Sequence, residues 1–134
     1  MKNKKVKKII WLSLALVFMV FLFIGGSWAI MLNGVKNMCR DARSEAKGDC
    51  VTNLQSLVLN KERSFAAKNA AIWALGQIAD PRAVPTLEAL AMVTPSQKAC
   101  RRSGELCGQE VARAIKWCRQ GNLTSWLYRG YKNW

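Results

Sequence analysis

The sequence contains no histidine and few acidic residues: 8 Asp and Glu stand against 21 Lys and Arg, which gives a net charge of +13. Histidine is the side chain used most often as a general base and as a metal ligand. The carboxylates form no pair on a common helix face that would serve as acid and base, and no CxxC pair offers a zinc site. We therefore expect a protein that is not an enzyme, with no cofactor and no metal.

The excess of positive charge predicts attraction to acidic proteins, anionic lipids or other polyanions. Basic side chains gather in the C-terminal third, close to several aromatic residues. The alternative interpretation is a solvated helix face, and we do not expect a nucleic-acid-binding protein. The candidate face for an anion or a partner consists of Lys98, Arg101, Arg102, Arg113, Lys116 and Arg119.

One long apolar run lies near the N-terminus. Residues 9–32 contain no charged side chain, and Trp11 and Trp28 lie near the two ends of the run. A bilayer core requires about 20 helical residues, so the run is long enough to cross it with some tilt. Tryptophan also favours the membrane interface. The run predicts a single transmembrane helix.

A cleaved signal peptide is the alternative interpretation of the same segment, because a basic start and an apolar core are common to both. Ser27 and Ala29 even flank Trp28 in a small-x-small arrangement. The apolar run, however, is longer than a typical signal core and continues past Ala29. Its length favours an uncleaved signal anchor. The lysines at residues 1–8 predict a cytoplasmic N-terminus, with the remainder of the chain outside.

Helical spacing continues beyond the apolar run, and no alternation typical of strands occurs. Residues 51–59 and 64–79 show apolar side chains at intervals of three and four, as expected for helices packed on one face. Asp80-Pro81 interrupts the pattern and starts a helix that runs to Val93. Further helices are expected over 103–119 and in the tail. The sequence therefore predicts an all-α fold.

The order of residues between Asn69 and Leu90 is specific: an alanine-rich helix is followed by Ala-Leu-Gly-Gln-Ile, then Asp-Pro-Arg-Ala-Val-Pro, then spaced leucines. This segment resembles the HEAT-like repeats of the phycobilisome-lyase type, with Ala79 at a position where the family usually has glycine. The repeat signature, which we expect to be structural, is Ala74, Leu75, Gly76, Ile78, Asp80, Pro81, Arg82, Val84, Pro85, Leu87 and Leu90. We expect Asp80 to cap the helix that follows it, as Asp49 is expected to cap the helix over 51–59. Gly76 should allow close contact with a neighbouring backbone, and Arg82 should pair locally or point along the edge of the repeat.

The resemblance implies a short α-solenoid of about two to three HEAT-like helix pairs, because one such repeat cannot bury its own apolar face. The spacing of Val51, Leu54 and Leu57 repeats that of Val84, Leu87 and Leu90, which supports an array. Such a repeat is usually a scaffold for another macromolecule. It does not imply lyase activity, because a fold does not determine a function.

All five cysteines follow the apolar run, which fits an oxidising compartment outside the cytoplasm. An odd number leaves at least one thiol unpaired within the chain. Cys107 and Cys118 are too far apart on one helix to be bridged. The candidate disulfides are Cys100–Cys107 and, if residues 40–48 are not one straight helix, Cys39–Cys50. Reduced, partly buried thiols remain an alternative.

The predicted organisation is a basic cytoplasmic segment (1–8), a transmembrane helix (9–32), a juxtamembrane linker or helical extension (33–48) and a HEAT-like domain (49–134). The leading functional hypothesis is a membrane-anchored adaptor of a bacterial inner membrane, with its domain in the periplasm. Its expected partners are the membrane and another protein, a membrane complex or a second copy of the chain. The alternative is a basic module that binds anionic lipid or polymer at the envelope.

Overall fold

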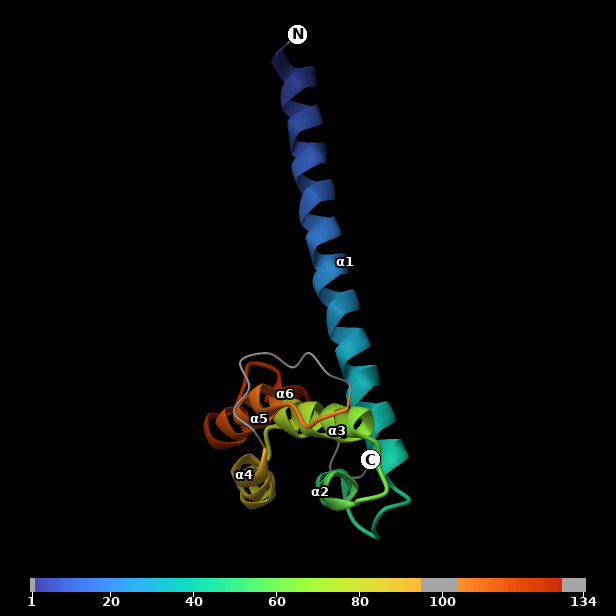
Figure 1. Cartoon of the computed structure of the whole chain (residues 1–134). Helices are drawn as coiled ribbons and strands as arrows, with labels where there is room; N and C mark the ends of the chain where they lie inside the picture. The colour runs from blue at the N-terminus through green and yellow to red at the C-terminus, as the bar shows by residue number, and fades with distance from the viewer. Residues whose placement is uncertain (1, 95–103, 129–134) are drawn as a thin grey trace. The chain divides into compact units, whose positions relative to one another are not determined.

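The computed structural model describes residues 2–94 and 104–128, and their side chains from residue 6 onward. The described residues contain helices and no strand, so the predicted all-α class is confirmed (Figure 1). The chain divides into two compact units, Met1–Asn33 and Gly34–Trp134. The helices are α1 (Lys2–Ala42), α2 (Cys50–Leu59), α3 (Phe65–Ile78), the 3-10 helix η1 (Pro81–Ala83), α4 (Val84–Val93), α5 (Gly108–Gln120) and α6 (Ser125–Tyr128).

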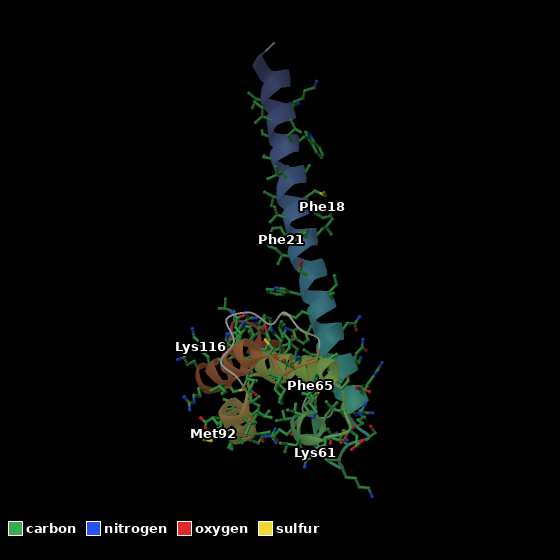
Figure 2. The ribbon with its side chains drawn as sticks, in the orientation of Figure 1. Phe18, Phe21, Lys61, Phe65, Met92 and Lys116 are labelled. Atoms are coloured by element: carbon green, nitrogen blue, oxygen red, sulfur yellow. A yellow bond between two sulfur atoms is a disulfide. The ribbon has the colours of Figure 1, made fainter. Side chains whose placement is uncertain are left out.

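The first unit is the larger part of α1, a helix long and apolar enough to cross a membrane. Its large apolar side chains are exposed, among them Phe18 and Phe21, which project away from the helix in Figure 2. The hydroxyl groups of Ser13 and Ser27 donate to the carbonyls of Ile10 and Phe23, each at 2.8 Å. These two polar side chains are therefore satisfied within the helix itself, as a lipid environment requires.

The second unit begins at Gly34, inside the segment 33–48 that the sequence assigned to a linker or helical extension. Helix α1 continues to Ala42, and Val35, Cys39 and Ala42 are buried in the core of the second unit. At Gly34 an added Cβ would lie 3.2 Å from the ring of Trp73, which shows how closely α1 approaches α3 here. The last turns of α1 thus belong to the folded domain.

Helices α2 and α3 both begin at side-chain caps. Asp49 accepts a hydrogen bond from the amide of Thr52, and Ser64 accepts one from the amide of Ala67. Each cap satisfies a backbone N–H that the first turn of a helix leaves without a partner. The cap at Asp49 was expected from the sequence, and the structure confirms it.

The turn between α3 and α4 is formed by the repeat signature. Ala79 ends α3 with φ 54° and ψ 43°, a left-handed conformation. Asp80 then accepts a hydrogen bond from the amide of Arg82, so it caps η1 as predicted. Pro85 lies in the first turn of α4, where its missing N–H breaks no helical hydrogen bond. The left-handed residue explains why glycine is usual at the position of Ala79.

Helix α5 begins later than the sequence suggested, at Gly108 instead of near Ser103, which itself lies outside the described residues. The side chain of Asn69 donates to the carbonyl of Glu105 at 3.0 Å and accepts from the amide of Cys107 at 2.9 Å. These bonds attach the preceding segment to α3. Cys107 has an extended backbone and caps α5, which therefore starts only at Gly108.

The core of the second unit is centred on α3, which packs against α2 and α5, while α4 packs against α5. At Gly76 an added Cβ would lie 3.2 Å from the Cα of Ala114, so α3 and α5 approach closely, as expected for this glycine. Figure 1 shows α2 and α4 on one side of the layer formed by α3 and α5. Helices α3 and α4, joined by η1, form one helix pair, and the expected number of two to three HEAT-like pairs stays a prediction.

We expect the substitution Ala79→Gly to stabilise the domain. A non-glycine residue in the left-handed region costs about 1–2 kcal/mol, and glycine loses part of that gain through its greater freedom in the unfolded chain. A net increase of about 0.5–1 kcal/mol in the free energy of unfolding is therefore predicted. Thermal unfolding of the full chain in detergent, followed by circular dichroism, measures it. Ala89→Gly, in the exposed middle of α4, is the control and should destabilise; stabilisation by both variants would contradict the explanation.

Candidate functional site

The second unit contains a cavity of about 410 Å³. This volume lies within the range of about 300–1,000 Å³ that small-molecule and side-chain pockets usually have. The cavity brings together part of the repeat signature, one residue of the predicted basic face and the disulfide. Its lining residues are Val35, Cys39, Asp49, Cys50, Val51, Ile78, Ala79, Asp80, Pro81, Arg82, Cys118, Arg119, Gln120, Gly121, Ser125 and Tyr128.

The cavity lies where α3 and α5 end and α2 begins. Ala79 ends α3, and Gly121, with φ 77°, ends α5. The chain therefore turns away from the cavity after each of these two helices. The side chain of Asn122 donates to the carbonyls of Gly76 and Gln77 at 2.9 and 3.1 Å. Those bonds satisfy two of the last carbonyls of α3 and fix the segment leading to α6 beside the cavity.

Arg82 joins two carboxylates at the cavity. Its Nη2 donates to Asp49 at 2.7 Å and to Asp80 at 2.8 Å, and its Nε donates to both oxygens of Asp80 at 3.1 Å. The two aspartates also cap α2 and η1, so one guanidinium connects the starts of two helices. The local pairing expected for Arg82 is therefore present, and it extends to a second helix.

The ion pairs change the pKa values of the two carboxyl groups at the cavity. The hydrogen bond from Arg82 holds the pKa of Asp80 below its ordinary value, against the opposing effect of burial. Burial would raise the pKa of Asp49, but hydrogen bonds from Thr52 and Arg82 outweigh it and lower that pKa. Both carboxylates are therefore ionised at neutral pH and bound to donors.

Two further polar groups line the cavity and are buried. Cys118 is a free thiol whose pKa is raised to about 11 by burial and by the negative charge of Asp80. A thiol in that state is a poor nucleophile. Tyr128 is 5% exposed, and its hydroxyl oxygen is buried without a hydrogen-bond partner in the described part of the chain. Neither residue was singled out from the sequence as a site residue.

Residues 67–91 match the family model described as PBS lyase HEAT-like repeat. The chain contains a HEAT-like repeat. The match covers most of α3, η1 and most of α4, and it includes every residue of the predicted repeat signature. No curated protein and no solved structure matches the chain.

The signature residues of the HEAT-like repeat have structural roles in this chain. Ala74, Leu75, Gly76, Leu87 and Leu90 are buried, while Asp80 and Arg82 form the ion pair at the turn. Pro81 and Pro85 start η1 and the first turn of α4. The repeat therefore supplies one wall of the cavity, and the C-terminal end of α5 together with α6 supplies another.

The candidate disulfide Cys39–Cys50 is present, with a Cα–Cα distance of 5.1 Å. It forms because α1 ends at Ala42 and residues 43–49 turn back toward α2, which is the condition the sequence required. Cys107 is also disulfide-bonded, while its expected partner, Cys100, lies outside the described residues.

The predicted basic face is divided by the structure. Lys98, Arg101 and Arg102 lie outside the described residues. Arg119 pairs with Glu88 of α4, and Arg113 pairs with Glu110 at 2.8 Å within α5. Figure 2 labels Lys116, whose exposed side chain lies on the same helix. Of the three members of this face that the structure describes, only Arg119 lines the cavity.

We expect Arg82→Met to destabilise the domain at neutral pH by about 1 kcal/mol, a value reduced because the guanidinium is 54% exposed. The folded state lowers the pKa values of Asp49 and Asp80. Their contribution to the free energy of unfolding is therefore present above the ordinary pKa of 3.8 and is lost as the pH falls below it. Thermal unfolding of the full chain at pH 7 and pH 3 should show that acidification lowers the stability of the variant less than that of the unsubstituted chain. Arg113→Met is the control, since its partner lies in the same helix; an equal effect at both positions would contradict this assignment.

Proposed function

We propose that the chain is a membrane-anchored HEAT-like adaptor that holds a partner protein at the cell envelope. Support comes from one combination: an apolar helix whose side chains are exposed precedes a unit that contains a HEAT-like repeat. HEAT-like repeats commonly present a surface to another macromolecule. Exposed apolar side chains along such a helix favour lipid as their environment.

The proposed role is binding and not catalysis. The charged groups at the cavity are bound to one another, with Arg82 between Asp49 and Asp80. The thiol of Cys118 has a raised pKa, which disfavours its use as a nucleophile. The word lyase in the family description names enzymes of that family, and the repeat alone carries no such activity to this chain.

The proposed orientation has residues 1–8 in the cytoplasm and the second unit outside, at the inner membrane of a bacterium. The lysines that precede the apolar run support a cytoplasmic N-terminus by the positive-inside rule. The disulfide between Cys39 and Cys50 supports an oxidising environment for the second unit.

The alternative of a surface that binds anionic lipid or polymer receives less support from the described residues. Arg113 and Arg119 are each paired with a carboxylate, which lowers the charge available to a polyanion. We therefore place protein binding first and treat anionic lipid as an outcome that an experiment can reveal.

The test is chemical crosslinking of intact cells, after permeabilising any outer layer, with a reagent that cannot cross the inner membrane. We expect the same partner protein to be captured with the full chain in repeated preparations. Replacing residues 1–33 by a cleavable secretion signal should release the domain and lower the capture, because anchoring raises the local concentration of the partner.

Three results would count against the proposal. Capture only after lysis would place the domain in the cytoplasm and contradict the orientation. Crosslinks to lipid alone would favour the anionic-surface alternative. The absence of any reproducible protein would contradict the adaptor role itself.

A further inference from the structure

We propose that the cavity receives an acidic side chain of the partner protein, an Asp or Glu carboxylate flanked by apolar residues. This inference rests on the adaptor role and names the chemistry of its binding site. It follows from comparing the hydrogen-bonding groups that the cavity has already used with those that remain without a partner.

The carboxylate oxygens at the cavity already accept most of the hydrogen bonds that they can. Asp49 accepts from the amide of Thr52 at 3.0 Å, from the hydroxyl of Thr52 at 2.7 Å and from Arg82. Asp80 accepts from the amide of Arg82 at 2.9 Å and from two nitrogens of its guanidinium. A carboxylate with three or four donors has little capacity left for a cation. A cationic occupant would therefore have to displace existing bonds.

Donors remain available. A guanidinium carries five N–H groups. Arg82 uses Nε and Nη2, and no described residue accepts from its Nη1. Arg119 uses only Nη2, toward Glu88, and leaves its other N–H groups without a partner in the described structure. Both side chains line the cavity and are more than half exposed, so their free donors can meet an occupant from solvent.

Tyr128 adds an independent observation. Its side chain lines the cavity and is 5% exposed, but its hydroxyl group has no hydrogen-bond partner among the described residues. A buried hydroxyl without a partner costs free energy that a carboxylate oxygen would recover. The guanidinium donors and this hydroxyl belong to η1, α5 and α6, so they surround the cavity from different elements.

Part of the remaining wall is apolar, beside Gln120 and Ser125. Val35, Val51, Ile78 and Pro81 line the cavity together with the Cys39–Cys50 disulfide. Apolar contact favours a carboxylate carried next to aliphatic side chains over a free inorganic anion. From residue 34 onward the chain has 16 Lys and Arg against 8 Asp and Glu, and this net charge of +8 adds long-range attraction for an acidic segment. The cavity thus favours an occupant that combines a negative charge with neighbouring apolar side chains.

The experiment uses the full chain in nanodiscs of zwitterionic lipid and three capped probe peptides, Leu-Glu-Leu, Leu-Gln-Leu and Leu-Lys-Leu. Affinities are measured by nuclear magnetic resonance titration. We expect the glutamate peptide to bind about tenfold more tightly than the glutamine peptide, the effect of one charge-assisted hydrogen bond. Arg119→Gln should remove most of this preference, and Tyr128→Phe should weaken binding of the glutamate peptide by a few-fold.

Arg113→Gln is the matched control, because Arg113 lies on the same helix, is paired with Glu110 and does not line the cavity. It should leave the preference unchanged, and circular dichroism should show all variants folded. Equal affinity for the glutamate and glutamine peptides, stronger binding of the lysine peptide, no binding at millimolar concentration, or an equal effect of Arg113→Gln would overturn the proposal. If the crosslinked partner is still captured in that case, the adaptor role stands and only the cavity assignment falls.

Discussion

The close approach of α3 and α5 is the constraint on which the second unit depends. Gly76 leaves room for the backbone of Ala114: an added Cβ would lie 3.2 Å from the Ala114 Cα, a tight contact that α5 would have to relieve by a small displacement. This contact brings the C-terminal ends of both helices together. The cavity forms there, because Ala79 and Gly121 turn the chain away from it on both sides. A packing requirement in the core thus places the candidate binding site.

The same turn combines strain with strong local interactions. Ala79 adopts a left-handed conformation that disfavours a residue with a side chain. Immediately afterwards Asp80 caps η1, and Arg82 links it to Asp49 at the start of α2. Because these bonds connect helices that are distant in sequence, they stabilise the turn from two sides. No described residue accepts a hydrogen bond from Nη1 of Arg82, so a residue with a structural role can also contribute to binding.

Much of the fold followed from the sequence because helical periodicity and capping act locally. The long apolar helix, the α3–α4 repeat, and the caps Asp49 and Asp80 are of this kind. The role of residues 34–42 could not be inferred, because Val35 and Cys39 are buried by contacts with distant parts of the chain. The same holds for the start of α5, which depends on Asn69. The cavity residues Cys118 and Tyr128 are brought to Arg82 only by tertiary packing.

The central claim is that the anchored domain presents this cavity to a partner protein. It is tested most directly by placing a photoreactive amino acid at Gln120, an exposed residue that lines the cavity, and separately at Met92, which is 86% exposed on α4 and does not line it. Irradiation of native membranes should give a protein adduct from position 120, and that adduct should decrease when Arg119 is also changed to Gln. An equal adduct from position 92, or none from position 120, would contradict the account.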